Sequence, residues 1–338
     1  MWTVRLPFCT LLRKAMKKEK PHILNRILSP LGVKVKRTLP GEYRTFSAAG
    51  KPTARRIGRF EILMYPSSQL FHIYGECPGY QAELGLIVKV VVGNSPRARV
   101  LDVGANVGDT LAIIRTHCDA PVLAIEGDGP SFELLARNVT MFPGAEALKA
   151  FLGERVESIS ADIRQVGWNA TLLPTKPTTV GGAGEVVHLD TLDRILSGRE
   201  ERADYRFLKI DAEGFDFRII RGAKEFLSDI HPVLFFEYNR GSADPPGEDA
   251  IATLAGLAGM GYRDMLVFDA GGRLVLRANL SMADLIRDLH DYIQGGMGMG
   301  YFDVCLFHAS DQAIADQCAA LERARRAFPP RASHGGGI

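Results

Sequence analysis

The twelve residues from Arg99 to Thr110, RVLDVGANVGDT, constrain the fold more than any other stretch of the sequence. The apolar residues at their start indicate a buried strand, and Gly104 and Gly108 are spaced for a tight turn into a helix. Such a turn lets a ligand approach the backbone closely and presents backbone N–H groups to it. The stretch therefore predicts an α/β fold with a ligand at the end of this strand, and a tight connection without a ligand is the alternative.

From residue 99 onward, short apolar runs alternate with helix-like stretches, which is typical of parallel strands joined by helical crossovers. Strands are expected at 99–103, 121–126, 146–151, 205–211, 232–238, 264–269 and 301–308. Helices are expected near 108–117, 130–140, 190–197, 215–229, 248–260 and 281–291. The stretch 268–275 indicates a hairpin, so some late strands should be antiparallel, and the Pro/Gly/Thr-rich stretch 171–184 indicates a loop. This is the shape of a class I methyltransferase sheet.

Charge is distributed unevenly along the 338 residues. Residues 1–60 contain fifteen Lys or Arg and two Asp or Glu, a local net charge of +13, so the other residues must carry −11 to give the overall +2. The asymmetry indicates a basic N-terminal arm, irregular or partly helical, on a mildly acidic body. We expect residues 61–98 to form a helical lead-in segment, and 311–338 to form a helix followed by a disordered tail.

The basic arm has three interpretations. Apolar residues alternate with cations in MWTVRLPFCTLLRKAMKKEK, and this pattern fits an anionic membrane surface, where each cation contributes about 1 kcal/mol. A solvated tail that packs on the acidic body is the simpler alternative. Nucleic acid is the least favoured partner, because aromatic residues are sparse and no reader motif is present.

Cysteine usage and hydropathy indicate the compartment. The five cysteines are widely spaced, without a C-x-x-C motif, which favours a reducing environment. No apolar stretch of signal-peptide length follows the N-terminal cations, and the most apolar run, 84–92, is too short to span a bilayer. We expect a cytoplasmic protein, peripheral to the inner face of the membrane if the arm binds lipid.

Two carboxylates accompany the glycine turn. Asp102 lies inside the first strand, and Glu126 ends the next strand, 22 residues after Gly104. An acid about 20 residues past the first turn accepts the ribose hydroxyls in nucleotide-binding folds. A partly buried Asp102 would repel a pyrophosphate but attract the sulfonium and ammonium groups of S-adenosylmethionine. The pattern therefore favours S-adenosylmethionine over NAD, whose G-x-G-x-x-G motif is incomplete because Asn106 replaces its second glycine.

Acidic residues also end the fourth and fifth strands. Asp211 interrupts an apolar run, and Glu237 follows another, with Asn239 two residues later. Ligands in open α/β sheets bind beyond the carboxyl ends of the strands, so these side chains should lie near one site. Glu213 and Asp216 fall in the first turn of a helix, where the helix dipole alone favours acids, so a purely structural role is the alternative for them.

Taken together, these segments resemble the FkbM family of S-adenosylmethionine-dependent methyltransferases. The resemblance rests on VLDVGANVGD (100–109), AIEGD (124–128), LDTLDRIL (189–196), LKIDAEGFDFRIIRGA (208–223) and PVLFFEYN (232–239). The family's K-I-D-V-E-G reads K-I-D-A-E-G here, and the residues before 61 lie outside the shared pattern.

The resemblance implies a class I methyltransferase fold, a Rossmann-like, seven-stranded, mostly parallel sheet with helices on both faces, over residues 99–310. It implies O-methylation of a hydroxyl on a sugar, polysaccharide, glycolipid or polyketide-type acceptor, with S-adenosylmethionine as the donor. The residues expected to bind this donor are Asp102, Gly104, Ala105, Asn106, Gly108 and Glu126.

Methyl transfer requires that an acceptor oxygen be aligned with the sulfonium methyl group, and a base assists it. Asp211 is the first candidate for this base, and Glu237 is the second. A Mg²⁺ ion held by the strand-end oxygens is a less favoured alternative. A non-catalytic nucleoside-binding or scaffold protein with the same fold is the alternative function.

Overall fold

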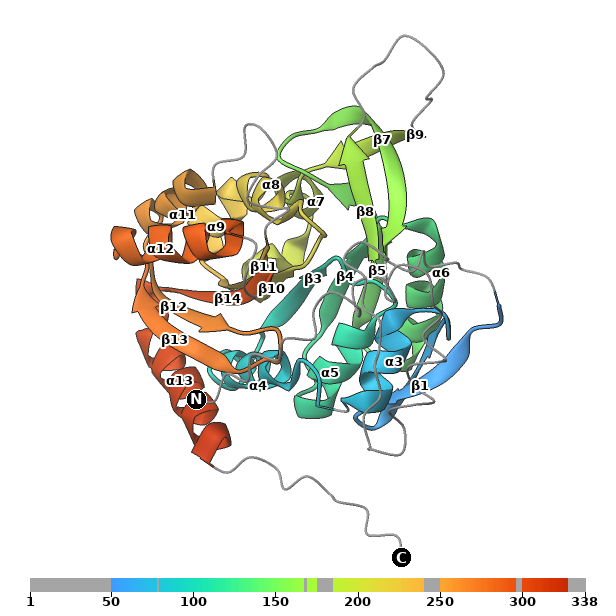
Figure 1. Ribbon diagram of the computed structural model, residues 1–338, viewed down its shortest axis with the longest axis horizontal. Coiled ribbons are helices and arrows are strands. Elements are labelled where there is room, and N and C mark those ends of the chain that lie inside the picture. Colours follow the sequence, from blue (N-terminus) through green and yellow to red (C-terminus); the bar gives the residue numbers. More distant parts are fainter. Residues whose placement is uncertain are drawn as a thin grey trace, which may run out of the picture. The chain divides into compact units, whose positions relative to one another are not determined.

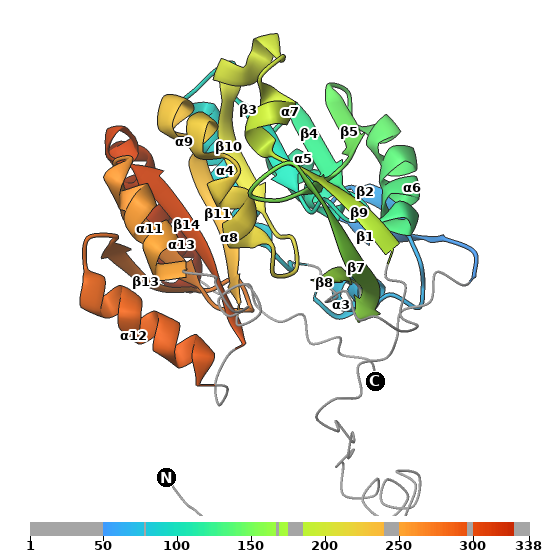
Figure 2. The ribbon, with the colours of Figure 1, turned by 90° about the horizontal axis from the view of Figure 1, so that it is seen from above.

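An eight-stranded sheet forms the centre of the fold in this computed structural model, which describes residues 50–77, 79–166, 169–174, 185–239, 250–295 and 300–327. The strand order is β13-β12-β14-β11-β10-β3-β4-β5 (Figure 1, Figure 2). The strands are β3 (Arg99–Val103), β4 (Val122–Glu126), β5 (Ala145–Lys149), β10 (Tyr205–Ile210), β11 (Val233–Asn239), β12 (Tyr262–Phe268), β13 (Leu274–Asn279) and β14 (Tyr301–His308).

The directions of the strands confirm the expected mostly parallel sheet. Strands β5, β4, β3, β10 and β11 run parallel to one another, whereas β14 is antiparallel to β11 and β12, and β12 is antiparallel to β13. All seven expected strands are present, and β13 is an eighth that follows the expected hairpin. It gave no signal in the sequence because it lies at the sheet's edge, where Val275 is exposed and the burial pattern is irregular.

Helices cover both faces of this sheet, as expected (Figure 1). Side chains alternate along each strand, so Phe207 of β10 points to one face and Leu208 to the other. One face, here the α8 face, packs against α7 (Leu192–Leu196), α8 (Asp216–Arg221), α9 (Lys224–Ile230), α11 (Ala250–Gly259) and α12 (Ala283–Gln294). The other, the α4 face, packs against α3 (Gln69–Glu76), α4 (Ala82–Gly93), α5 (Asp109–His117), α6 (Gly129–Asn138) and α13 (Gln312–Ala327).

Ordered structure begins inside the segment that we expected to be an irregular or partly helical arm. Strands β1 (Thr53–Ile57) and β2 (Phe60–Met64) form an antiparallel hairpin. Its turn packs so closely that a Cβ on Gly58 would lie 2.0 Å from Thr116 Oγ1. The boundary expected at residue 60 therefore cuts through a hairpin. The interpretations of residues 1–49, and of the tail from 328, concern residues outside the described ranges.

A second sheet replaces part of the loop that we expected at 171–184. It has the order β6-β9-β7-β8, with β6 (Phe151–Leu152), β7 (Glu157–Val166), β8 (Asn169–Pro174) and β9 (Glu185–Asp190). The expectation of a loop was wrong for 171–174, which pair with β7. Residues 175–184 lie outside the described ranges.

The single helix expected over 215–229 is two helices, α8 and α9. The chain is interrupted at Gly222, where a Cβ would lie 2.1 Å from the carbonyl oxygen of Gly153. This close backbone contact holds α8 against the turn that follows β6.

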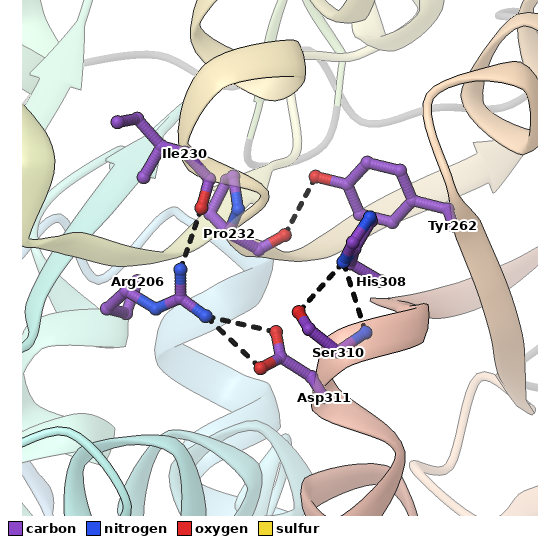
Figure 3. A network of polar contacts seen from close by, with 7 residues as sticks. All are labelled: Arg206, Ile230, Pro232, Tyr262, His308, Ser310 and Asp311. Carbon is purple, nitrogen blue, oxygen red and sulfur yellow. Dashed lines mark hydrogen bonds and ion pairs between the residues drawn. The ribbon is translucent and has the colours of Figure 1, made fainter.

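The edge of the sheet at which the parallel strands begin, here the amino edge, is joined by polar contacts (Figure 3). Arg206 donates from Nη1 to the carbonyl of Ile230 at 2.7 Å and forms an ion pair with Asp311 at 3.1 Å. The Tyr262 hydroxyl donates to the carbonyl of Pro232 at 2.9 Å. These contacts join the start of β11 to β10, β12 and the segment after β14. The opposite edge, here the carboxyl edge, holds the candidate site.

The cysteines that the structure describes, namely Cys77, Cys118, Cys305 and Cys318, form no disulfide. None of the described helices combines the length and the apolar character needed to cross a bilayer.

Candidate functional site

The turn after β3 lies directly against the turn after β10. Gly104 has φ +75°, and a Cβ at this position would lie 1.8 Å from the carbonyl oxygen of Asp211. Gly108, at the start of α5, has φ +86°, and Asn106 between them has φ +47°. A side chain at 104 would therefore force the two strand ends apart, which explains the glycine.

The backbone N–H groups of this turn are used inside the protein. Gly104 and Ala105 donate to the carbonyl of Ile125 at 2.9 and 3.0 Å, and Gly108 donates to the carbonyl of Ala105 at 2.8 Å. Asn106 donates to the carboxylate of Glu126 at 2.8 Å. The expectation that these N–H groups face a ligand is therefore wrong, because they tie the turn to β4 instead. Gly104 instead provides the room that lets the turn after β10 pack against this turn.

Glu126 joins the ends of β3 and β4. In addition to the Asn106 contact, its carboxylate accepts a hydrogen bond from the N–H of Asp128 at 2.7 Å. Burial raises the pKa of Glu126 to about 7, although these hydrogen bonds oppose the shift. The side chain is thus held in one orientation, with a protonation equilibrium near neutral pH.

Glu126 and Gly104 line a cavity on the α8 face of the carboxyl edge, here the first cavity. Its volume is about 70 Å³, within an empty space of about 610 Å³ that includes open solvent. The cavity is lined by Val103, Gly104, Asn106, Ile125, Glu126, Gly127, Ser131, Ala150, Phe151, Leu152, Asp211, Ala212, Glu213, Phe215 and Ile219. Apolar side chains and a few polar groups that converge from three strand ends are typical of a small-molecule site.

A second cavity meets the first at the same edge, on the α4 face. Its empty space is about 370 Å³, and it is lined by Leu70, Tyr80, Gln81, Gly104, Asn106, Asp109, Thr110, Lys209 and Asp211. Gly104, Asn106 and Asp211 line both cavities. The two cavities therefore form one site that passes over the end of the sheet.

Lys209, which the sequence analysis did not single out, separates Asp102 from this site. Asp102 is fully buried, not partly buried as expected, and lines neither cavity. Lys209 Nζ lies 3.3 Å from Asp102 and 3.4 Å from Asp211. Burial opposes the charged form of Lys209, but these carboxylates and Asp109 outweigh it and raise the lysine's pKa. Asp102 therefore holds Lys209, and Lys209 faces the second cavity.

Glu237 lies at the same edge but outside both cavities. It is paired across the strands with Asp303 of β14, and Asn239 donates a hydrogen bond to it. Burial and the nearby carboxylate of Asp211 raise the pKa of Glu237 well above its usual range, and burial does the same for Asp303. These shifts favour the neutral form of both carboxyl groups.

Asp216 supports the turn that carries Asp211. Its carboxylate accepts hydrogen bonds from the N–H groups of Ala212 and Gly214, both at 3.2 Å. These contacts agree with the alternative of a purely structural role for Asp216. Glu213 differs, because it has φ +49° and lines the first cavity.

The helices of the α4 face add groups that the sequence analysis missed. Tyr80 precedes α4 and lines the second cavity with Asp109. Asp109 accepts a hydrogen bond from the Tyr74 hydroxyl at 2.8 Å, and burial raises its pKa to about 6. Asp109 stands one residue after Gly108, a first-turn position that the helix dipole also explains. Only the packing of α3 and α4 reveals it as part of a cavity.

The donor-binding residues expected from the sequence thus divide into two sets. Gly104, Asn106 and Glu126 line the first cavity. Asp102, Ala105 and Gly108 line neither cavity. Within the described ranges, no cluster of three His, Cys, Asp or Glu side chains is arranged to hold a metal ion.

Comparison with known families gives a match over part of the chain. Residues 102–263 match the family described as the methyltransferase FkbM domain. This range begins at Asp102 and includes the ends of β3, β4, β10 and β11, from which the site is built. No curated protein matches the sequence.

Solved structures give distant similarities. The methyltransferase FkbM of Methylobacillus flagellatus KT is 18% identical over 43% of this chain and 33% of its own, with a TM-score of 0.30. The chain therefore spans about a third of that protein. Precorrin-6y C5,15-methyltransferase of Geobacter metallireducens GS-15 is 10% identical over 67% and 88%, with a TM-score of 0.35. A TehB-like methyltransferase of Corynebacterium glutamicum is 12% identical over 71% and 94%, with a TM-score of 0.34.

Proposed function

Since residues 102–263 match the methyltransferase FkbM domain, we propose that the chain transfers a methyl group from S-adenosylmethionine to a hydroxyl of a sugar, polysaccharide, glycolipid or polyketide-type acceptor. The observation that carries this proposal is the meeting of Gly104, Glu126 and Asp211, from three different strands, in one cavity at the carboxyl edge. Ligands of open α/β sheets bind at this edge.

In this proposal the donor's nucleoside occupies the first cavity. Glu126 accepts hydrogen bonds from the two ribose hydroxyls through lone pairs that its backbone contacts leave available. Gly104 lets the turns after β3 and β10 pack closely, which brings Asp211 to the wall of this cavity. The donor's sulfonium and ammonium groups are attracted by the buried carboxylates at this edge, because Coulomb attraction is strong where the local dielectric is low.

Asp211 is the group best placed to act on the acceptor. It lines both cavities, so it faces the donor on one side and the second cavity on the other. Methyl transfer is an in-line displacement in which the acceptor oxygen loses its proton, and we assign that proton to the Asp211 carboxylate. Lys209 fixes this carboxylate by its ion pair. Glu237 is the weaker candidate, because its raised pKa favours its neutral form and it lines neither cavity.

The acceptor would enter from the second cavity. Its wall combines the phenol of Tyr80, the amide of Gln81 and the hydroxyl of Thr110 with two carboxylates. Groups that both donate and accept hydrogen bonds suit a ligand rich in hydroxyl groups. This wall supports an oxygen acceptor of the carbohydrate or polyketide type.

Calorimetry tests the donor half of the proposal. S-adenosylmethionine and S-adenosylhomocysteine should both bind the full chain, and NAD should not. Turnover with labelled S-adenosylmethionine on fractionated glycans and lipids tests the acceptor half. Binding of NAD without binding of the methyl donor would contradict the proposal, and donor binding without transfer to any fraction would favour a non-catalytic nucleoside-binding protein.

A further inference from the structure

Asp102 is a carboxylate inside a buried strand, and its side chain lines neither cavity of the site. Lys209 of the neighbouring strand β10 is in register with it, and Lys209 Nζ lies 3.3 Å from its carboxylate. Among the described residues, Lys209 is the one cation that pairs with Asp102. Burying a carboxylate is costly, and a buried ion pair contributes little to stability, so stability alone does not explain this pair.

The same lysine reaches the proposed base. Lys209 Nζ lies 3.4 Å from the carboxylate of Asp211, whose side chain is 28% exposed, whereas the side chain of Asp102 is fully buried. The Lys209 side chain is 3% exposed, so water does not replace either partner. The two carboxylates also interact with each other: burial and the charge of Asp211 raise the pKa of Asp102, and Lys209 opposes the shift.

The other titratable groups found around Asp211 in the described part of the chain are carboxyl groups and phenols. They come from every element packed against it, and they are Tyr80, Asp102, Asp109, Glu126, Glu213, Asp216, Glu237, Tyr301 and Asp303. Among the described residues, Lys209 is the one lysine or arginine that lines either cavity. It is therefore the counter-ion of the Asp211 carboxylate at this edge.

Methyl transfer changes the charges around this lysine. The acceptor oxygen forms a bond to the methyl carbon, the carbon–sulfur bond breaks and leaves its electron pair on sulfur, and the acceptor's proton passes to Asp211. Asp211 is then neutral and no longer balances Lys209. A buried ammonium group without a counter-ion is costly, so a lysine paired with Asp211 alone would oppose this proton transfer.

We propose that Asp102 is a positioning residue for the methyl transfer, which balances the charge of Lys209 while Asp211 takes the acceptor's proton. Lys209 keeps a carboxylate partner before and after the transfer, so it orients Asp211 without making that carboxylate too weak a base. This role rests on the proposed function of Asp211. It adds a residue that acts through Lys209 and lines neither cavity.

The protonation of Asp211 can be followed in the full chain by ¹³C NMR of labelled aspartate carboxyl groups, with Asp211→Asn to identify the signal. Asp102→Asn should lower the pH at which Asp211 is half protonated by about one unit, because Lys209 then pairs with Asp211 alone. Asp311→Asn is the matched control, since Asp311 is also buried beside a cation, Arg206, at the amino edge. It should leave that pH unchanged. No shift in Asp102→Asn, or an equal shift in the control, would overturn the proposal.

The lysine should move the same titration in the opposite direction. Lys209→Met should raise the pH at which Asp211 is half protonated by about one unit or more, because carboxylates then surround it. The double variant Asp102→Asn/Lys209→Met removes both members of the buried pair and leaves no unpaired charge, so it decides if a single variant fails to fold. Its half-protonation pH should lie within about half a unit of that of the unmodified protein. A rise of one unit or more in the double variant would show that Asp102 does not balance Lys209.

The pH dependence of turnover tests the link to catalysis. In Asp102→Asn, the acid limb of the kcat profile should move about one unit to lower pH, and kcat above that limb should fall about threefold, because Asp211 is a weaker base. The donor's Kd should change about twofold or less. A lower kcat with an unmoved limb would show a purely structural role, and a weaker donor affinity with an unmoved limb would make Asp102 a donor-binding residue. Either result would overturn the proposal.

Failure of the proposed function gives a different result. If no fraction accepts a methyl group, or if Asp211→Asn retains full turnover, the function assigned to Asp211 is wrong. The NMR titration of the free protein needs no acceptor, so opposite shifts in Asp102→Asn and Lys209→Met would still support the charge balance, and shifts in the same direction would exclude it.

Discussion

The two edges of the central sheet differ in how their buried polar groups are partnered. At the amino edge, cations meet carboxylates and hydroxyls meet carbonyls: Arg206 pairs with Asp311, and Tyr262 donates to Pro232 (Figure 3). At the carboxyl edge, buried carboxyl groups gather, and burial together with the Asp211 carboxylate raises the pKa of Glu237. Glu237 is opposite Asp303, and one lysine, Lys209, contacts two carboxylates.

The pKa values of the carboxyl groups also differ between the two edges. At the carboxyl edge, burial raises the pKa of Glu126 and of Asp216 to about 7 and that of Asp109 to about 6. Burial also raises the pKa of Asp311 at the amino edge, but the guanidinium of Arg206 opposes the shift. The ion pair at the amino edge thus contributes to stability. At the carboxyl edge, by contrast, the pKa values of several buried carboxyl groups are raised, a pattern typical of functional sites, and a cationic ligand would favour their charged forms.

The largest effect should come from the carboxylate that lines both cavities. Asp211→Asn should lower kcat about 100-fold or more, because a general base contributes at least that much, and should change the donor's Kd about threefold or less. Steady-state kinetics and calorimetry measure the two values. Glu237→Gln is the matched control, since an amide mimics the neutral carboxyl group. A greater loss in Glu237→Gln than in Asp211→Asn would make Glu237 the base.

Glu126→Ala tests donor recognition at the same edge. We expect it to weaken S-adenosylmethionine and S-adenosylhomocysteine alike, by about 30-fold, because both nucleosides carry the same ribose and lose hydrogen bonds to a charged group. Calorimetry measures both constants. Glu133→Ala, an exposed glutamate of α6, should leave them unchanged. A loss confined to one of the nucleosides would remove Glu126 from the ribose site.

Arg206→Met tests the amino edge. It should lower the free energy of unfolding by about 2 kcal/mol, because it leaves the mostly buried Asp311 without its cation, and should leave donor affinity unchanged. Urea denaturation measures the change. Arg273→Met breaks the exposed pair with Asp269 and should cost about 0.5 kcal/mol or less. Equal costs in the two variants would contradict the difference that we draw between buried and exposed pairs.

The smallest effect should be that of pH on the carboxyl edge. The raised pKa values mean that the free protein holds protons there at pH 6 that a cationic donor displaces, so donor affinity should rise about threefold from pH 6 to 7.5. The same groups bind protons more tightly in the folded than in the unfolded protein, so their contribution to stability should fall as pH rises through this range. Calorimetry in two buffers of different ionisation enthalpy should detect proton release, and proton uptake would reverse the argument.

The parts of the fold and the site that could be predicted are those that depend on residues close together in the sequence. The strand-end positions of Gly104, Glu126 and Asp211 followed from local apolar runs, because parallel strands end at a common edge. The role of Lys209 could not be predicted in this way, because it depends on the strand register that places this lysine beside Asp102. Tyr80 and Asp109 were missed because they reach the second cavity only through helix packing. Strand β7, ESISADIRQV, lacks the apolar run that marked the other strands.

The three residues that line both cavities have a consequence for the order of events on the enzyme. Gly104, Asn106 and Asp211 line both cavities, so a donor in the first cavity and an acceptor in the second, as proposed, would contact the same three residues. Their binding free energies are then coupled, and the coupling is reciprocal: whatever the donor does to the acceptor's affinity, the acceptor does to the donor's. S-adenosylhomocysteine keeps the nucleoside and lacks the sulfonium charge, so under the proposed function the acceptor's affinity should differ between the enzyme with S-adenosylmethionine and the enzyme with S-adenosylhomocysteine.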